Sequence, residues 1–357
     1  MSGARLPWRR PLGRTGIEVS ALCLGSMTWG TQNTVADAAS QIDLALERGV
    51  DFIDTAEMYP TTPLLPEAQG DTERAIGAWL SSTRRRDDVI IATKVTGNGR
   101  KALNGGHDIT GARLREALEG SLERLCTDHV DLYQLHWPNR GSYHFRQHWN
   151  YDPSRQAGDY DRARVRDNIL DVLSTCAELI TEGKIRAIGL SNESAWGVMQ
   201  FLDVAEANGL PRVASIQNEY HLLNRLFDTD LAEVAHHEDV GLLAFSPLAA
   251  GMLSNKYADG ALPAGSRRAI NDTLGGRWSH GSAQAAERYA ALAAELGLQP
   301  AQLALAFCLS RPFMTSVIVG ATRMEQLDVD LAAADIVLTA EALEAISELH
   351  REFPMTM

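Results

Sequence analysis

The sequence predicts an α/β fold, a (β/α)8 TIM barrel with an N-terminal extension before the first barrel strand and long loops at the C-terminal face. Eight short apolar runs alternate with segments whose apolar residues recur every three or four positions. Such alternation is typical of a parallel sheet with helical crossovers. Eight consecutive units match a barrel, which usually has about 250 residues and tolerates insertions. An open doubly wound sheet is the alternative, but it rarely needs eight evenly spaced units.

The candidate strands are residues 21–25, 51–56, 89–95, 130–137, 187–192, 214–220, 241–248 and 316–321. Several intervening segments carry helix signals. Thr110 is a suitable N-cap for a helix whose leucines recur every three or four residues. Gly183 and Gly209 end two further apolar stripes, and Pro300 stands where another helix begins.

The surplus length is predicted to lie in three irregular segments, residues 1–20, 139–166 and 257–282. The chain shows no internal repeat, linker or low-complexity tract. We therefore expect residues 1–357 to form a single domain.

Composition limits the possible functions. The chain has 357 residues, of which 45% are hydrophobic, and a formal net charge of -13. The negative charge argues against nucleic-acid and anionic-membrane partners, which demand a basic face. No apolar run approaches the roughly 20 residues of a membrane span, and no signal-peptide core follows the charged N-terminus. Four scattered cysteines in apolar stretches predict buried reduced thiols and a cytoplasmic protein: Cys23, Cys126, Cys176 and Cys308.

Four polar residues lie at or just beyond the ends of three neighbouring candidate strands: Asp54, Tyr59, Lys94 and His136. The ends of adjacent parallel strands stand about 4.8 Å apart, so these side chains should converge. A lysine at a crowded barrel rim needs a partner for its charge, and Asp54 is the available carboxylate. Catalytic groups of such barrels gather at this end.

The chemistry of this quartet follows from its charges. A nearby ammonium favours the phenolate, so Lys94 is expected to lower the pKa of Tyr59 from about 10 and make it a usable proton donor. Asp54 would hold Lys94, and His136 would orient a bound carbonyl. The site suits protonation of an oxygen while another group delivers a hydride.

Two other patterns point elsewhere. The stretch Gly97-Asn-Gly-Arg-Lys-Ala102 fits a dinucleotide fingerprint, but no helix begins at once, so a loop is the better interpretation. A metal-dependent hydrolase is the main enzymatic rival. Its chemistry needs several imidazoles or carboxylates on one ion, and no His-x-His stands at a strand end. We predict no metal site.

Several separate motifs, in order along nearly the whole chain, resemble the aldo-keto reductase superfamily. They are Leu12-Gly-Arg-Thr-Gly16, Phe52-Ile-Asp-Thr-Ala-Glu-Met-Tyr59, Thr93-Lys94, Asp131-Leu-Tyr-Gln-Leu-His-Trp-Pro138, Gly183-Lys-Ile-Arg-Ala-Ile-Gly-Leu-Ser-Asn192, Gln217-Asn-Glu-Tyr220 and Ser246-Pro-Leu-Ala249. The stretches at 54–60, 69–73 and 191–194 look most like the Tas-type branch.

The resemblance implies an NADPH-dependent reductase of aldehydes and ketones in which Tyr59 is the general acid. It implies that Tyr220 stacks on the nicotinamide while Ser191, Asn192 and Gln217 hold its carboxamide. The pyrophosphate would lie along Ser246, Leu248, Gly251, Lys256 and Arg267. The adenosine end would lie along Gly320, Thr322 and Gln326, with Arg323 contacting a 2'-phosphate, which suits NADPH over NADH.

One region departs from the family pattern. Val329 and Asp330 replace a Glu-Asn pair found in many relatives. An aspartate accepts but does not donate a hydrogen bond to adenine, and its charge opposes a 2'-phosphate. The expected cofactor is therefore NADPH with weakened adenosine contacts.

The substrate and partners are less determined. The loop 139–166 follows His136 and would either roof a substrate pocket with Trp29, Met58 and Trp137 or mediate subunit contacts. The expected partner is a small aldehyde or ketone, and the sequence is compatible with an oligomer. The alternative function is a nicotinamide-sensing regulatory subunit, as in the potassium-channel β subunits of the same superfamily.

Overall fold

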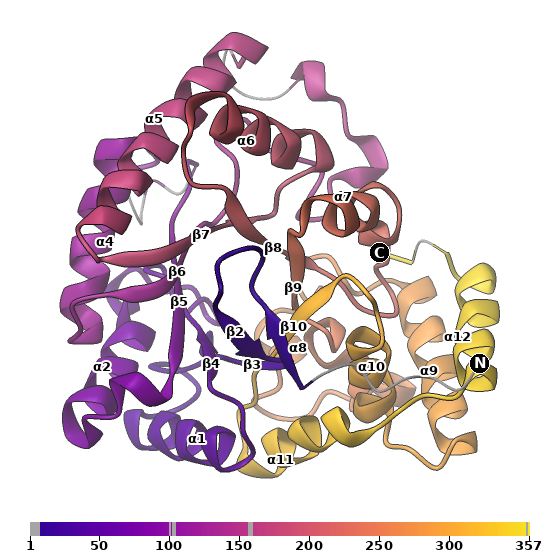
Figure 1. Cartoon of the computed structure of the whole chain (residues 1–357). Helices are drawn as coiled ribbons and strands as arrows, with labels where there is room; N and C mark the ends of the chain where they lie inside the picture. The colour runs from indigo at the N-terminus through magenta and orange to yellow at the C-terminus, as the bar shows by residue number, and fades with distance from the viewer. Residues whose placement is uncertain (1–7, 100, 102–104, 156–159, 355) are drawn as a thin grey trace.

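A computed structural model of the chain describes residues 8–99, 101, 105–155, 160–354 and 356–357. Eight parallel strands close into a barrel in the order β10-β3-β4-β5-β6-β7-β8-β9, as predicted (Figure 1). Their bounds are β3 (Leu22–Gly25), β4 (Phe52–Asp54), β5 (Ile90–Val95), β6 (Val130–Leu135), β7 (Ile185–Ser191), β8 (Val213–Glu219), β9 (Gly241–Phe245) and β10 (Met314–Val319).

Helices form a ring around the strands (Figure 1). They are α1 (Val35–Glu47), α2 (Asp71–Thr83), α4 (Gly111–Leu125), α5 (Arg162–Thr181), α6 (Ala195–Asn208), α7 (Asp230–Glu238), α10 (Pro300–Leu309) and α11 (Met324–Ala332). The short α8 (Arg267–Ile270) lies in the loop after β9, and α9 (His280–Glu295) packs beside α12 (Ala340–Glu352). Their inward faces and the strands share one continuous apolar core.

Several helices begin or end at, or next to, the residues that the sequence predicts. The Thr110 side chain accepts a hydrogen bond from the backbone N–H of Arg113 and caps α4. Gly209 ends α6 in the left-handed conformation, Gly183 follows the end of α5, and Pro300 is the first residue of α10. The stretch 97–102, which we interpret as a loop, lies partly outside the described residues.

A hairpin closes the N-terminal end of the barrel. β1 (Arg9–Pro11) pairs antiparallel with β2 (Glu18–Ser20), and we call residues 9–20 the hairpin plug. Its tip approaches the barrel so closely that a Cβ on Gly13, whose φ is +57°, would stand 2.6 Å from the Ala214 carbonyl oxygen. Three plug side chains, Leu12, Ile17 and Val19, pack on inward-facing strand residues: Cys23, Phe52, Ala92, Leu132, Ala187, Ala214, Leu243 and Ile318. The sequence predicts an N-terminal extension here but not its hairpin structure.

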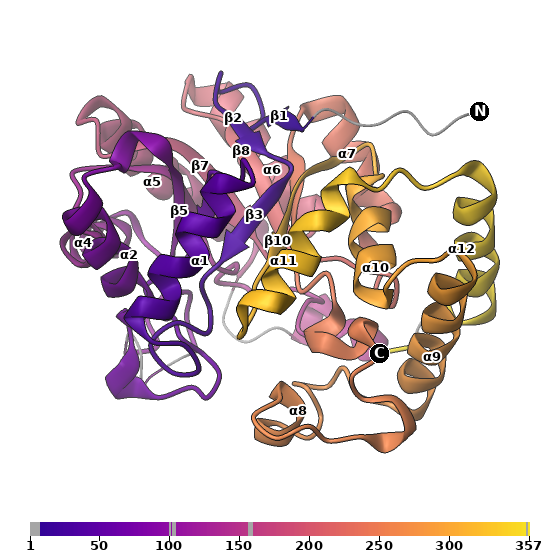
Figure 2. The ribbon, with the colours of Figure 1, turned by 90° about the horizontal axis from the view of Figure 1, so that it is seen from below.

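The opposite end carries the long loops. Figure 2 shows the hairpin plug at the top and α8, with the loop 257–282, at the bottom beyond the carboxyl ends of the strands. No single helix in the described ranges is long and apolar enough to cross a membrane, and the bent pair α9–α10 reaches that length and composition only jointly.

The cysteine prediction is wrong at one position. Cys23, Cys176 and Cys308 are buried free thiols, but Cys126 is exposed. It lies at the C-cap of α4 in the left-handed conformation, where the helix ends and the chain turns toward solvent.

Candidate active site

The four residues of the predicted quartet converge at the C-terminal end of the barrel. Lys94 Nζ lies 2.6 Å from Asp54 Oδ2 and donates to the Thr55 carbonyl at 2.8 Å. It also lies 3.4 Å from the hydroxyl oxygen of Tyr59. The Tyr59 and His136 rings meet edge to face with centroids 5.6 Å apart. An ammonium, a carboxylate, a phenol and an imidazole therefore form one cluster.

Lys94 is buried as a charged group. Its exposed fraction is 0% and that of Asp54 is 3%. Burial lowers the pKa of Lys94, but Asp54 and Tyr59 outweigh that effect, so the pKa lies above its ordinary value. A buried cation with its own carboxylate therefore stays protonated beneath the phenol.

Asp54 has further partners. Gln217 Nε2 donates to Asp54 Oδ1 at 2.8 Å, and Gln134 Nε2 donates to the same oxygen at 3.2 Å. Both carboxylate oxygens are thus engaged, which fixes the side chain that holds Lys94.

The predicted pKa of Tyr59 is corrected by the structure. Its pKa is raised, because removal of the phenol from water outweighs the opposing attraction of Lys94. The ammonium acts in the predicted direction, but in a buried setting it only limits the rise. Tyr59 is accordingly a neutral donor near pH 7.

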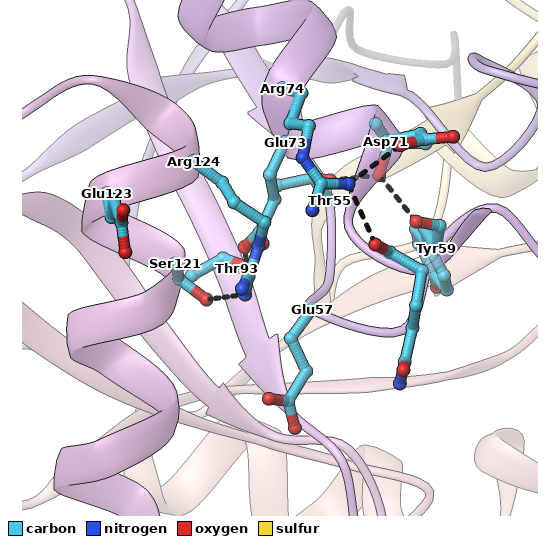
Figure 3. Close-up of polar contacts among 12 residues, drawn as sticks. Thr55, Glu57, Tyr59, Asp71, Glu73, Arg74, Thr93, Ser121, Glu123 and Arg124 are labelled. Carbon is cyan, nitrogen blue, oxygen red and sulfur yellow. Dashed lines mark hydrogen bonds and ion pairs between the residues drawn. The ribbon is translucent and has the colours of Figure 1, made fainter. Parts of the chain in front are cut away.

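A polar cluster behind the site fixes the turn that carries Tyr59. The Tyr59 carbonyl accepts from the Gly70 backbone at 2.9 Å and from Thr72 Oγ1 at 3.4 Å. Thr93, beside Lys94, donates at 2.6 Å to Glu73, which also binds Arg124 Nε at 2.7 Å. Figure 3 shows Glu73, Thr93 and Arg124 gathered behind that turn. This buried network ties the start of α2 to the strand that supplies Lys94.

The quartet opens into a large cavity with a volume of about 1170 Å³. Asp54, Tyr59 and His136 line it, together with residues from the ends of β7, β8, β9 and β10. This volume exceeds the usual range of small-molecule pockets, about 300–1,000 Å³, and so has room for a dinucleotide and a small second molecule.

Comparison with known proteins decides the family. A family model described as "Aldo/keto reductase family" matches residues 21–351. The chain belongs to the aldo/keto reductase family. It is therefore an oxidoreductase of a family that uses NAD(P)H and acts on small carbonyl compounds.

Similarity to individual proteins supports the family assignment. "Protein tas" of Escherichia coli (strain K12) is 42% identical over 346 residues, covering 95% of this chain and 96% of that protein. The "Uncharacterized oxidoreductase YrpG" of Bacillus subtilis (strain 168) is 32% identical over 342 residues, covering 95% and 94%. The "Probable voltage-gated potassium channel subunit beta" of Oryza sativa subsp. japonica is 30% identical over 350 residues, covering 96% of each chain. The likeness to the Tas proteins supports the predicted Tas-type branch.

The carboxamide residues implied by aldo/keto reductase membership lie together on the cavity wall. Ser191, Asn192 and Gln217 all line it. Asn192 Nδ2 donates to the His136 carbonyl at 3.0 Å, whereas its buried Oδ1 has no hydrogen-bond partner among the described residues. An unused acceptor is what an incoming amide N–H group needs.

The implied pyrophosphate residues also line the cavity: Ser246, Leu248, Gly251, Lys256 and Arg267. Burial lowers the pKa of Arg267 to about 10, and burial lowers the pKa of Lys256. At a pKa of about 10, Arg267 still carries its charge at pH 7. A Cβ on Gly251 would stand 2.3 Å from Lys256 Cε, so the bare glycine makes room for that cation.

Of the residues expected to bind the adenosine end of the cofactor, most line the cavity and one does not. Gly320, Thr322, Gln326 and Asp330 line the cavity, together with Val329. Arg323 is exposed and is not part of the cavity lining; it is the N-cap residue of α11. Burial raises the pKa of Asp330 to about 7, although Lys256 opposes the rise.

Two of the predicted aromatic site residues, Tyr220 and Trp29, do not lie on the cavity wall. Tyr220 is fully buried, donates to Asp228 Oδ1 at 2.7 Å and stacks on Phe307 with centroids 6.0 Å apart. It does not line the cavity, whereas Phe245 at the end of β9 does. Trp29 is also fully buried, with Nε1 donating to Gln41 at 2.9 Å, and lies outside the lining.

The other predicted pocket residues, Met58 and Trp137, do line the cavity, and both long loops contribute to it. Phe145 and Arg146 come from the loop 139–166, and Arg277 comes from the loop 257–282. Phe245 and Arg277 are not among the site residues that the sequence predicts. The described residues contain no group of three or more His, Cys, Asp or Glu side chains able to hold a metal ion.

Proposed function

We propose that this protein is an NADPH-dependent reductase that converts aldehydes and ketones to alcohols, with Tyr59 as the proton donor. The observation that carries the proposal is the contact of Lys94 Nζ with both Asp54 and the Tyr59 hydroxyl at the floor of the cavity. Such a cluster prepares one phenol to give up a proton and stabilises the anion that results.

The lining residues fit a nicotinamide dinucleotide. Asn192 Oδ1 is a buried acceptor for the carboxamide, and Phe245 offers an aromatic side chain on the wall of the same cavity. Lys256 and Arg267 supply positive charge for phosphates. When bound, NADPH would supply the hydride that reduces the carbonyl carbon.

The chain's own residues would handle the proton. His136 hydrogen-bonds the substrate oxygen and orients it toward Tyr59. The phenol then donates its proton to that oxygen as negative charge develops there, and Lys94 stabilises the phenolate left behind. Water returns the proton to Tyr59 after the alcohol leaves.

The preference for NADPH rests on charge. Lys256 interacts electrostatically with Asp330 and Arg323 at the adenosine end, so its positive charge favours an additional phosphate there, whereas Asp330 opposes that phosphate when ionised. Because burial raises the pKa of Asp330 to about 7, part of that opposition is absent at neutral pH. NADH is therefore expected to bind more weakly than NADPH.

Turnover with a panel of aldehydes and ketones tests the proposal. Purified protein should oxidise many equivalents of NADPH per molecule with at least one simple aldehyde, and kcat/KM for NADPH should exceed that for NADH. Equal or better use of NADH would overturn the cofactor assignment. No turnover with any carbonyl compound would overturn the reductase assignment.

The second candidate function is a nicotinamide-sensing regulatory subunit. It is favoured by the likeness to proteins named as probable potassium channel β subunits in rice and in Arabidopsis thaliana. A sensor would retain NADPH through gel filtration and reduce aldehydes in single, very slow turnovers. A reductase would exchange its cofactor on the timescale of turnover.

We also propose the cellular compartment and the domain organisation of the protein. The buried free thiols Cys23, Cys176 and Cys308 suit a reducing compartment, and we propose the cytoplasm. The shared apolar core extends from Ala21 to Met357, which supports one domain.

A further inference from the structure

The cavity wall carries two arginines that the proposed reduction does not use. Arg146 follows β6 in the loop 139–166, and Arg277 precedes α9 in the loop 257–282. Both line the cavity, although their side chains are only 18% and 11% exposed. Two cations that are largely removed from water need compensation by negative charge.

One carboxylate serves both guanidinium groups. Glu219, the last residue of β8, accepts from Arg277 Nε at 2.6 Å and lies 3.1 Å from Arg146 Nη1. His221 Nε2 lies 3.2 Å from the same carboxylate, and burial lowers the pKa of that imidazole. Two guanidinium charges face one carboxylate, so at least one positive charge remains uncompensated.

The loop backbone holds Arg146 in its place. Phe145 and Arg146 have φ values of +57° and +65°, an unfavourable conformation for two successive residues with side chains. Opposite them, a Cβ on Gly276 would stand 3.1 Å from Arg146 Cδ. The bare glycine backbone therefore makes room for this arginine.

The hydrogen bonds of Arg146 leave donors unused. A guanidinium has five N–H donors. Within the described part of the chain, Arg146 makes one side-chain hydrogen bond, from Nη1 to Glu219. The remaining donors can bind an anion that enters the cavity.

The same loop connects this charge to the reaction centre. The rings of His136 and Trp137 lie 4.9 Å apart, and those of Trp137 and Phe145 lie 6.1 Å apart. An imidazole, an aromatic wall and a guanidinium therefore follow one another along residues 136–146. Lys256, in contrast, shares its part of the cavity with Asp330 on α11.

We propose that Arg146 and Arg277 form a subsite for an anionic group, carboxylate or phosphate, on the carbonyl substrate. This inference rests on the proposed reductase function. It narrows the substrate class to carbonyl compounds that carry an apolar segment between the carbonyl group and an anionic group. The carbonyl would lie at Tyr59 and His136, the apolar part against Trp137 and Phe145, and the anion at the arginines.

Three aldehydes that share one ring test the proposal. They are 4-carboxybenzaldehyde, 4-formylphenyl phosphate and the neutral methyl 4-formylbenzoate. We expect kcat/KM for at least one anionic aldehyde to exceed that for the ester by about tenfold, the effect of one charge-assisted hydrogen bond. The anion that is preferred identifies carboxylate or phosphate as the natural group.

Two variants locate the preference. Arg146→Gln should reduce the anionic-to-neutral kcat/KM ratio to about one. Arg155→Gln, in the same loop but with an 84% exposed side chain, should keep the wild-type ratio. Circular dichroism checks that each variant is folded, and protein fluorescence follows its NADPH affinity. A wild-type ratio near one, or a ratio that survives Arg146→Gln, would overturn the subsite. Loss of NADPH affinity in Arg146→Gln with an unchanged ratio would assign the arginine to the cofactor instead.

A binding measurement separates this inference from the reductase proposal. Calorimetry with NADP⁺-loaded protein would compare 4-(hydroxymethyl)benzoate and 4-(hydroxymethyl)phenyl phosphate with methyl 4-(hydroxymethyl)benzoate. Preferential binding of an anion, lost in Arg146→Gln, supports the subsite even if none of the aldehydes is turned over. Turnover of all three aldehydes without any anionic preference leaves the reductase and removes the subsite.

Discussion

The two ends of this barrel are filled by opposite chemistry. At the N-terminal end, Leu12, Ile17 and Val19 of the hairpin plug close the barrel with apolar packing. At the C-terminal end, Lys94, Asp54 and Gln217 fill the interior with hydrogen-bonded polar groups beneath a cavity. Burying charge costs stability and burying apolar surface adds to it. One end of the barrel therefore stabilises the fold, while the other end is built for chemistry.

The largest effect is expected when the buried cation at the open end is removed. Lys94→Met leaves Asp54 without its cation, so the free energy of unfolding should fall by roughly 3–5 kcal/mol. Turnover should fall by roughly 10²- to 10⁴-fold, because the phenolate of Tyr59 loses its stabilising charge. Urea unfolding and NADPH oxidation measure the two effects.

The matched control for Lys94 is an exposed ion pair. Arg351 and Glu344 are 64% and 65% exposed, so Arg351→Gln should change stability by less than about 1 kcal/mol. If Lys94→Met is as stable and as active as this control, the open end does not depend on its buried charge.

A cavity at the closed end should affect stability alone. Leu12 is fully buried in the hairpin plug, so Leu12→Ala should reduce the free energy of unfolding by roughly 2–5 kcal/mol. Turnover per folded molecule should stay at the wild-type value. Leu262→Ala, at a 58% exposed position, should leave stability within about 0.5 kcal/mol. A tenfold loss of turnover in folded Leu12→Ala would contradict the division between the two ends.

A smaller change tests the phosphate region. Gly251→Ala places a Cβ 2.3 Å from Lys256 Cε and should weaken NADPH binding about tenfold, worth about 1.4 kcal/mol, by displacing that cation. Gly209→Ala imposes the same left-handed strain at a site with nothing within 4 Å of the new Cβ. Fluorescence titration should show weakened binding only in the first variant, and equal affinities in both would remove Lys256 from the cofactor site.

The smallest effect concerns pH. Burial raises the pKa of Asp330 to about 7, so the carboxyl is mostly neutral at pH 6 and mostly ionised at pH 8.5. Because its folded pKa lies above the reference value of about 3.9, Asp330 removes stability as pH rises through 7. Its charge should also weaken NADPH binding about fivefold over that range, the effect of about 1 kcal/mol.

Two variants isolate the Asp330 contribution. Asp330→Asn should remove this part of the pH dependence of NADPH affinity, measured by titration from pH 6 to pH 8.5. Asp328→Asn, in the same helix but half exposed and paired with Arg48, should retain it. A pH slope that persists in Asp330→Asn would place its origin in another group.

The barrel and its quartet are predictable from the sequence because both depend on local patterns. Alternating periodicities define the eight units, and parallel topology then brings Asp54, Lys94 and His136 to one end. The hairpin plug is harder to predict, because its two strands have only three residues each and show little periodicity.

The sequence is least informative where one residue of register decides the direction of a side chain. Tyr220 and Phe245 both lie at strand ends, yet only Phe245 faces the cavity while Tyr220 packs outward on Phe307. Successive strand residues point to opposite sides, so motif position alone does not fix the side. The Glu219 contacts join residues 73 and 58 positions apart across two irregular loops, and no local pattern predicts them.

The turnover of Tyr59→Phe, measured with a simple aldehyde and saturating NADPH, shows most directly whether Tyr59 is the proton donor. Phenylalanine keeps the ring against His136 but removes the hydroxyl that contacts Lys94. We predict that kcat falls by roughly 10²- to 10⁴-fold while NADPH affinity is retained. Near-normal aldehyde reduction by this variant would show that the proton comes from a group other than Tyr59.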